Sequence, residues 1–319
     1  MKRRSPLVSD DANALLDHLE ISALTDADAN ASASQLKTEV EMTGSEDALD
    51  PAEEGAASLS EQLEGKIDGA FTEAERRIKS CGSSYPFDVQ RKALLPRDRE
   101  FSSVYTFLLG LSTYGENAIP EMDAAKLFEE TCAHASRIYF GSKEHPAATH
   151  IFGFPRRIGE RGFQKALSDL CSVHLCEGVP DEKMPNAHTK KDAGLDIVIW
   201  RNFPDSRSSK FIAFGQCATG GNWWGKRHEL QPDDWCNTWL TKRPQVTPMK
   251  VFFVPHAVDD DLWGELGYTA GVIFDRFRIA FYAEQNLPDA LRKELQRWTR
   301  AVFTRIGAAV PRRKTSKRF

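Results

Sequence analysis

Residues 192–226 decide the fold. They begin Asp192-Ala-Gly-Leu-Asp196-Ile-Val-Ile-Trp200, cross a polar stretch at 202–209, and continue Phe211-Ile-Ala-Phe-Gly-Gln216-Cys217 toward Lys226. Each apolar run is a short series of β-formers, and the stretch between them is rich in the residues of turns, which predicts strands over 195–200 and 211–217. Asp196 opens the first strand and Gln216 closes the second. If the two strands pair, we expect both side chains near the same end of the sheet.

Helical and strand patterns alternate around this pair of strands. Apolar residues at helical spacing predict helices over 99–112, 123–140, 161–175, 229–240 and 288–306, and residues 178–193 form a long polar loop. Further short runs of β-formers predict strands over 249–254 and 271–274. This order of elements predicts a mixed α/β layer and not a doubly wound nucleotide-binding fold.

Charge divides the 319 residues into three parts. Residues 1–80 hold 18 acidic and 8 basic residues, a net charge of -10, and the remainder holds 28 acidic and 34 basic residues, or +6. We expect 1–80 to be an acidic, largely disordered arm with short helices near 12–19 and 59–71, because 24–58 has too little apolar content to offset chain entropy. The folded domain covers 81–306, and a basic tail covers 307–319. The charged ends are open to two interpretations, solubilising segments or contacts with partners.

Composition excludes several classes of protein. A hydrophobic content of 41% is enough for a core, so a wholly disordered or fibrous chain is excluded. No apolar run approaches the length of a membrane span, and none follows the basic start as in a signal peptide, so we expect neither membrane insertion nor secretion. The six cysteines are scattered without a paired motif, which is typical of reduced thiols in a cytoplasm.

Asp196 and Gln216 together suggest a metal site. Two oxygen donors at a sheet edge suit Mg²⁺, which prefers oxygen ligands and keeps water or phosphate in its remaining positions. A metal bound there could polarise a phosphodiester and lower the pKa of an attacking water. Other uses remain open, because Asp196 could be a turn aspartate before a strand and Gln216 a hydrogen-bonding residue at a strand end.

At these residues the sequence resembles the PD-(D/E)XK, or restriction-endonuclease-like, nuclease superfamily. Its core is a helix, a β-hairpin, a crossing helix and a further strand, and the resemblance covers about residues 124–255. Asp196, within Gly194-Leu195-Asp196-Ile197, matches the motif aspartate, and Gln216 matches its glutamate or glutamine position. Ala218 occupies the lysine position, so Lys226 is the nearest candidate for a migrated lysine.

The resemblance implies a role for each candidate catalytic residue. Asp196, Gln216 and a backbone carbonyl near Cys217 would hold Mg²⁺ or Mn²⁺, and Lys226 would stabilise the developing charge or orient water. The family often adds a glutamate on the preceding helix, a position for which Phe128-Glu129 fits. Glu160 and Glu177 compete with Glu129 for it, and for all three a solvated helix face is the alternative.

The residues after the second strand suit nucleic acid. Asn222, Lys226, Arg227 and His228 could contact a phosphate backbone, and Trp223 with Trp224 could belong either to the core or to a stacking surface. Residues 220–226 also match the G-x4-G-K part of a phosphate-binding loop. Arg227 stands where that loop needs Ser or Thr, which makes a nucleotide-binding module the weaker interpretation.

From these residues and the resemblance, we expect a metal-dependent DNA nuclease of a bacterial cytoplasm, with genome defence as its setting. A catalytically inactive nuclease fold that serves as a DNA-binding or assembly subunit is the alternative, supported by Ala218. The acidic arm could dock a protein partner or compete with DNA for the basic surface. Neither the oligomeric state nor the choice between DNA and RNA follows from the sequence.

Overall fold

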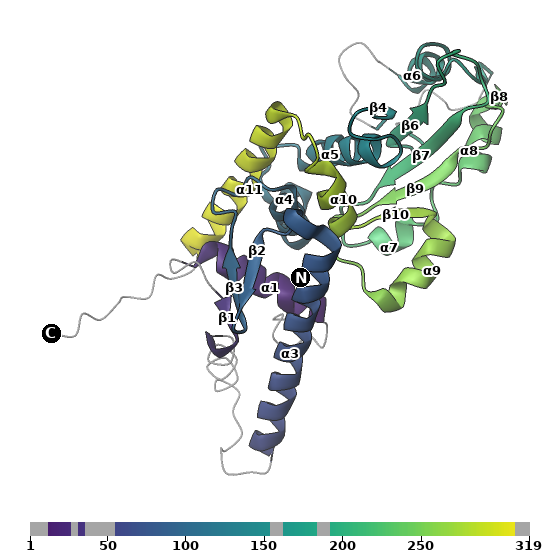
Figure 1. Ribbon diagram of the computed structural model, residues 1–319. Helices are drawn as coiled ribbons and strands as arrows, with labels where there is room; N and C mark the ends of the chain where they lie inside the picture. Colours follow the sequence, from purple (N-terminus) through teal and green to yellow (C-terminus); the bar gives the residue numbers. More distant parts are fainter. Residues whose placement is uncertain (1–11, 27–30, 36–54, 154–161, 184–191, 310–319) are drawn as a thin grey trace.

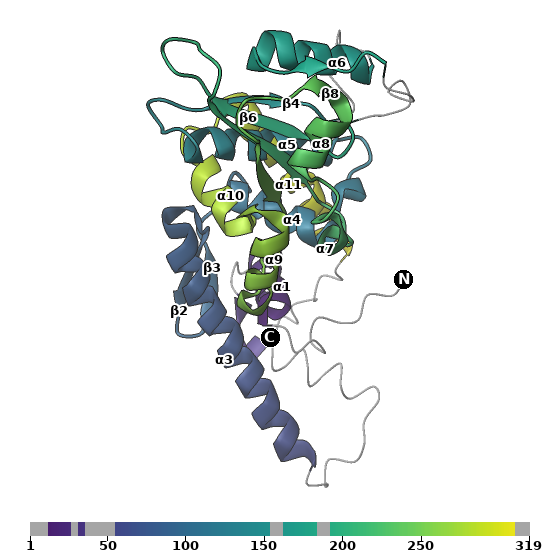
Figure 2. The ribbon, with the colours of Figure 1, turned by 90° about the vertical axis from the view of Figure 1, so that its right-hand side faces the viewer.

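The computed structural model describes residues 12–26, 31–35, 55–153, 162–183 and 192–309. Its centre is a five-stranded mixed sheet in the order β10-β9-β7-β6-β4. The chain is therefore α/β, as the alternation of patterns predicts, with helices on both sides of the sheet (Figures 1 and 2). The strands of this sheet are β4 (Ala148–Ile151), β6 (Ile197–Arg201), β7 (Phe211–Cys217), β9 (Met249–Phe253) and β10 (Val272–Phe274).

Pairing within the sheet changes direction once. β4 pairs antiparallel with β6 and β6 antiparallel with β7, whereas β7 pairs parallel with β9 and β9 parallel with β10. A parallel pair needs a crossover, and between β7 and β9 this is α8 (Pro232–Trp239), reached through the one-turn helix α7 (Trp223–Lys226). Between β9 and β10 the crossover is α9 (Asp260–Ala270).

Alternation along β6 and β7 gives each face of the sheet its own core. Ile197 and Ile199 face the larger cluster, beneath α4 (Val104–Tyr114), α5 (Ala124–Tyr139), α10 (Arg276–Ala283) and α11 (Asp289–Ala309). Val198 and Trp200 face the opposite cluster, with α6 (Phe163–Asp169), the π-helical turn Leu170–Leu175 and α8. Because successive side chains of a strand point to opposite faces, two apolar faces explain the unbroken apolar run of β6.

Two helices of the predicted arm belong to the folded body. α1 (Ala12–Thr25) buries Leu15, Leu16 and Leu19, and α3 (Gly55–Cys81) buries Ile67 and Phe71, all in the larger core. The expectation of a largely disordered arm ending at residue 80 is therefore wrong for these helices. Residues 1–11, 27–30 and 36–54 lie outside the described residues, as do 310–319 of the predicted basic tail.

A buried ionic network fixes α1 and α3 to the body. Arg77 donates to Asp17 at 2.6 Å and to Tyr105 at 3.0 Å, and Arg276 of α10 forms two hydrogen bonds with Asp17, at 2.6 and 2.8 Å. Glu20 accepts from Tyr105 at 2.9 Å. Arg77, Arg276 and Glu20 are fully or almost fully buried, and buried charges are tolerated when each finds its partner. Composition alone missed this packing because the acids of α1 are paired inside the protein.

Most predicted boundaries move by a few residues for local reasons. The helix predicted from 99 begins at Val104, because Ser103 caps it by accepting from the Thr106 N–H at 3.1 Å. The helix predicted from 229 begins at Pro232, a residue suited to a first helical turn. The helix predicted over 161–175 becomes π-helical from Leu170 and ends where Cys176 takes a left-handed conformation at φ 53°.

Smaller elements complete the described chain. β1 (Ala31–Ser32), β2 (Phe87–Gln90) and β3 (Ala93–Pro96) form one small sheet, and β5 (Val179–Pro180) pairs with β8 (Leu240–Lys242) in another. Short 3₁₀ turns cover Gly82–Ser84 and Glu116–Ala118. Within the described ranges, every helix is too short or too polar to cross a membrane.

Candidate active site

Pairing of β6 with β7 brings Asp196 and Gln216 together. Ile197 lies opposite Gly215, so the same register continued by one residue places Asp196 opposite Gln216. The Asp196 N–H donates to the Gly215 carbonyl at 2.9 Å, and its Oδ2 accepts from the Cys217 N–H at 2.7 Å. The expectation that the two strands pair and bring these side chains to one end of the sheet is confirmed.

Glu129 reaches the same place from α5. This helix packs against β4 and β6, and Gly153 lies two residues after the end of β4. The Gly153 N–H donates to the Asp196 carbonyl at 3.1 Å, and a Cβ on Gly153 would lie only 2.9 Å from both carboxylate oxygens of Glu129. The absence of a side chain at Gly153 therefore lets the Glu129 carboxyl group sit beside the backbone that carries Asp196.

The surroundings raise the pKa of both carboxyl groups. Burial raises the pKa of Glu129 to about 9, and the neighbouring Asp196 carboxylate adds to this shift. Burial also raises the pKa of Asp196 to about 7, opposed by its hydrogen bond from the Cys217 N–H. Asp192 raises both pKa values further. Ionising all the carboxyl groups of such a cluster is unfavourable, because their negative charges repel one another and are partly buried. A cation bound among the oxygens would lower the free energy of the ionised state.

Gln216 contributes an acceptor without a partner. Its side chain is buried, and its Nε2 donates to Glu229 Oε2 at 3.0 Å. Its Oε1 is buried and accepts no hydrogen bond from the described residues. A buried acceptor left unpaired costs about 1–3 kcal/mol, so this oxygen is suited to an additional ligand.

Lys226 completes the charged set. It ends α7, is half-buried, and lies close enough to Asp196 to lower the pKa of that carboxyl group. Its ammonium makes no hydrogen bond or ion pair with the part of the chain that the structure describes. The next residue, Arg227, is fixed by Lys250, whose Nζ donates to the Arg227 carbonyl at 2.6 Å. α7 thus offers an unpaired cation at the edge of the carboxyl cluster.

The two competitors of Glu129 do not join this group. Glu177 lies at the other end of the β6–β7 pair, where its carboxylate accepts from the Ser209 N–H at 2.7 Å and the Gln245 N–H at 3.2 Å. Its role there is to fix loops. Glu160 lies outside the described residues.

The four residues predicted to contact nucleic acid divide into two kinds. Asn222 and His228 are exposed, and Lys226 is half-buried with an unpaired ammonium. Arg227 is engaged within the protein, since its guanidinium stacks 4.0 Å from the centre of the Trp224 ring and donates to Glu265 at 2.8 Å. We therefore assign Arg227 to holding α7 in place, and not to phosphate contact.

Trp223 and Trp224 belong to the protein interior more than to a stacking surface. Both pack, partly buried, against a cluster formed by β9, β10 and α9. Trp223 also stacks on His256, with ring centres 5.5 Å apart. Of the two interpretations that the sequence left open, packing is the one that the structure favours.

Two acidic residues of the site were missed by the sequence analysis. Asp192 accepts from the Gly194 N–H at 2.9 Å in the turn before β6, and Glu229 accepts from Gln216. Asp192 could have been found from the sequence, because it stands two residues before a glycine in the turn that precedes β6. Nothing in the sequence pointed to Glu229, because it is brought close to β7 only by the course of the chain after α7.

The oxygens of this site are of the kind that a hard divalent cation takes as ligands. Among the described residues, no three His, Cys, Asp or Glu side chains are arranged to hold a metal ion. The set found here combines the Asp196 and Glu129 carboxyl groups with the unpaired Gln216 Oε1, and Mg²⁺ accepts such mixed oxygen ligands when water fills its remaining positions. The Cys217 backbone adjoins them, while its thiol interacts with that of Cys132 on α5. No protein-family model, curated protein or solved structure matches this chain.

Proposed function

We propose that this protein is a metal-dependent nuclease that hydrolyses DNA phosphodiester bonds, with genome defence as its setting. The observation that carries the proposal is the convergence of Glu129, Asp196 and Gln216 at one end of the sheet, with Lys226 beside them. Two carboxyl groups with raised pKa values lie beside a buried acceptor and a cation that have no partner among the described residues, and structural roles alone do not explain such a set.

The order of elements around the site supports the resemblance to the PD-(D/E)XK superfamily. α5 precedes β4, β6 and β7, which are consecutive antiparallel strands, and α8 crosses to β9, which is parallel to β7. This order is compatible with the helix, hairpin, crossing helix and further strand of the superfamily core. Asp196 and Gln216 would then occupy the motif positions on the two hairpin strands.

Each residue has a defined part in the proposed reaction. Asp196, the Gln216 Oε1 and the Cys217 carbonyl would hold Mg²⁺ or Mn²⁺, which supplies polarisation of the phosphodiester and a more acidic water. With a cation bound, Glu129 would be ionised, and its carboxylate could orient the attacking water and accept a proton from it. Lys226 places its ammonium where negative charge develops on the phosphate oxygens.

An inactive nuclease fold that binds DNA or assembles with other proteins is the second candidate. Ala218 stands at the motif lysine position and is fully buried in the cluster beneath α9. The motif lysine position therefore supplies no cation, and in the proposed site catalysis would depend on Lys226 alone. The two candidates differ in one respect that can be measured, which is cleavage.

Cleavage of linear, supercoiled and single-stranded DNA with Mg²⁺ or Mn²⁺ tests the proposal. We expect wild-type protein to cut and Asp196→Asn to lose at least about 100-fold in rate, because the metal loses a charged ligand. Asp205→Asn is the matched control, since Asp205 is an exposed residue in the turn of the same hairpin. Equal cutting by wild type and Asp196→Asn would refute the site. No cutting by wild type, with DNA binding intact, would favour the inactive fold.

A further inference from the structure

The outward side of α11 carries a stripe of cations that the proposed active site does not use. Lys293, Arg297, Arg300 and Arg305 are all exposed, and the first three follow the spacing of a single helix face. With Gln296, Ala301 and Thr304 they line a hollow of about 570 Å³. We call these seven residues the α11 stripe.

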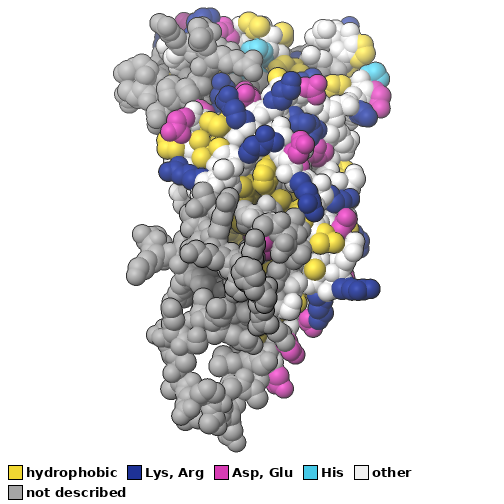
Figure 3. Space-filling model, turned by 90° about the vertical axis from the view of Figure 1, so that its left-hand side faces the viewer, with side chains coloured by type: hydrophobic (Ala, Val, Ile, Leu, Met, Phe, Trp, Pro, Cys, Tyr) yellow, Lys and Arg dark blue, Asp and Glu magenta, His cyan; other side chains and the backbone are white. Residues whose placement is uncertain are grey.

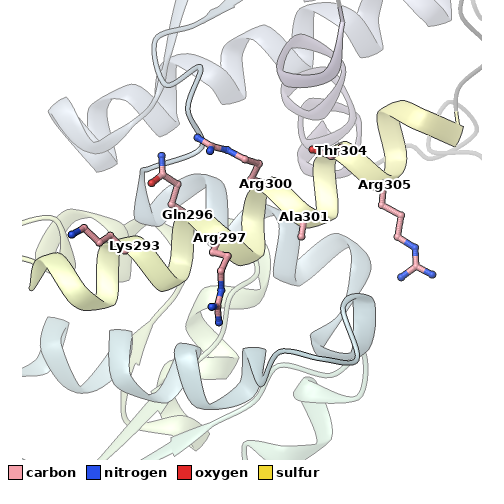
Figure 4. Close-up of a pocket in the computed structure, with 7 residues that line it drawn as sticks. All are labelled: Lys293, Gln296, Arg297, Arg300, Ala301, Thr304 and Arg305. Carbon is pink, nitrogen blue, oxygen red and sulfur yellow. The ribbon is translucent and has the colours of Figure 1, made fainter.

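The charged side chains of the stripe itself are all cations. Figure 4 shows Gln296 and Arg300 projecting on one side of the helix axis and Arg297 and Arg305 on the other. Figure 3, which views the molecule from the side on which α11 lies in Figure 1, shows many Lys and Arg side chains on this face, with Asp and Glu side chains among them. At 1.5 Å per residue the four cations extend over about 18 Å, the length of about five base-pair steps of one DNA strand.

Internal contacts leave most of this charge available. Arg297 pairs with Glu294 of the same helix at 2.7 Å, while Arg300 and Arg305 donate only to backbone carbonyls, those of Glu100 at 3.4 Å and Ala118 at 3.1 Å. Lys293 makes no ion pair with a described residue. One carboxylate therefore opposes four cations along the stripe, and backbone contacts orient two guanidinium groups without neutralising them.

The other side of α11 shows why a lipid surface is the wrong partner. Leu295, Trp298, Val302 and Phe303 are all buried in the larger core. A helix that lies on a membrane places apolar residues beside its cations, so that they enter the acyl region. The stripe offers only Ala301 as an apolar side chain. It likewise lacks an aromatic residue, the platform on which proteins stack unpaired bases.

A chain of contacts connects the stripe with the candidate active site. Arg305 donates to the carbonyl of Ala118, the last residue of the 3₁₀ turn Glu116–Ala118. Glu116, which opens that turn, accepts a hydrogen bond from Thr219. Thr219 follows Gln216 on the chain by three residues. The C-terminal part of α11 is therefore joined through this single turn to the strand end that carries the carboxyl cluster.

We propose that the α11 stripe binds the sugar-phosphate backbone of duplex DNA and orients it relative to the candidate active site. This deepens the proposed nuclease function and rests on it. Arginine favours this partner because its planar guanidinium donates two parallel hydrogen bonds to a phosphate. Gln296 and Thr304 add neutral donors of the kind that contact phosphates without reading sequence. The contact is therefore independent of base sequence.

Binding measured without cleavage tests the proposal. In an Asp196→Asn background, Lys293→Gln, Arg297→Gln and Arg300→Gln together form the stripe variant. Its affinity for a fluorescent duplex, followed by anisotropy over a salt series, should fall about 10- to 100-fold at low salt. The slope of log affinity against log salt should become shallower by about 2.7, because each lost phosphate contact contributes about 0.9.

Controls separate loss of this surface from loss of positive charge. Lys165→Gln, Arg207→Gln and Lys242→Gln together remove three exposed cations; α6 and β8, which carry Lys165 and Lys242, lie on the opposite side of the molecule from α11 in Figure 1. This control variant should keep most of the slope. Lysine in place of Arg297 and Arg300 should restore the slope of log affinity against log salt. That result would show that the stripe variant lost positive charge and not its fold. Thermal melting of each variant checks that the core is intact.

The possible results distinguish this inference from the nuclease proposal. A shallower slope in the stripe variant supports the stripe even if wild-type protein cuts no DNA. Equal slopes for the stripe and control variants would overturn the proposal that the α11 stripe binds DNA, even if wild-type protein cuts DNA. Binding of anionic vesicles that depends on the stripe, with duplex binding unchanged, would overturn it in favour of a lipid partner.

Discussion

Glu129→Gln perturbs the carboxyl cluster without changing its shape. In the folded protein burial and Asp196 raise the Glu129 pKa from 4.5 to about 9, so the folded state holds a proton that the unfolded chain releases. Stability contributed by this group is complete below about pH 4.5 and is lost as pH rises toward about pH 9. The free energy of unfolding of the metal-free wild-type protein should therefore fall as pH rises through neutrality. The Glu129→Gln variant should not show this fall, because glutamine has no proton to lose.

The magnitude follows from the number of protons involved. One proton held by the folded state alone gives a slope of about 1.4 kcal/mol per pH unit, or about 2 kcal/mol between about pH 6.5 and about pH 8. Because Glu129 keeps some contact with water, we expect about 1–2 kcal/mol. Urea unfolding of both proteins at the two pH values, with a chelator present, gives this quantity from the midpoints and slopes.

The comparison cancels the pH dependence of the groups that do not interact with Glu129. The free energy of unfolding of Glu129→Gln should exceed that of wild type, and the difference should widen from the lower to the higher pH. Mg²⁺ should narrow it, because a cation stabilises the ionised carboxylate of wild type. Glu75→Gln removes an exposed helical glutamate and is the control. A difference that stays constant with pH would refute the placement of Glu129 in the cluster.

Three further substitutions test other parts of the structure. Gly153→Ala would place a Cβ 2.9 Å from the Glu129 oxygens, and the end of that flexible side chain would move aside, so we expect a cost of about 1 kcal/mol or less in urea unfolding but at least a tenfold loss of any metal-dependent cleavage; unchanged cleavage would contradict the close approach. Arg77→Leu leaves Asp17 and Glu20 buried without one partner and should cost about 3–5 kcal/mol; a loss below about 1 kcal/mol would show that α1 is not packed as described. Gln216→Glu adds a charge beside Asp196, so calorimetry should show tighter Mg²⁺ binding and melting should show lower metal-free stability; neither effect would occur if Gln216 lay away from the cation.

The sequence predicts the central hairpin and its chemistry because both are local. Short runs of β-formers predicted the strands at 197–201 and 211–217 within two residues of their bounds, and the pairing of Asp196 with Gln216 follows from the register of two adjacent strands. Asp196, Gln216 and Lys226 were therefore accessible from the sequence. Glu129 was accessible only through the resemblance, because nothing in an amphipathic helix shows which of its acids turns toward a sheet.

Non-local contacts account for what the sequence analysis missed. The acids of α1 give the first 80 residues the composition of a flexible arm, yet Asp17 and Glu20 are neutralised by Arg77 and Arg276, of which the second lies 259 positions from Asp17. Composition records charges and not their partners. The exclusion of Glu177 from the site has the same origin, since only tertiary structure places it at the opposite end of the hairpin.

The sequence by itself determined the α/β class, the motif strands and the chemical character of three site residues, because these depend on residue type and on neighbours a few positions apart. Tertiary structure decided that α1 and α3 complete the core, that Glu129 and not Glu177 meets Asp196, and that Arg227 holds α7 while the cations of α11 stay exposed. Each of these depends on which charges become buried and paired. Burial and pairing are settled by the packing of segments far apart in the chain, a property that no local pattern of residues contains.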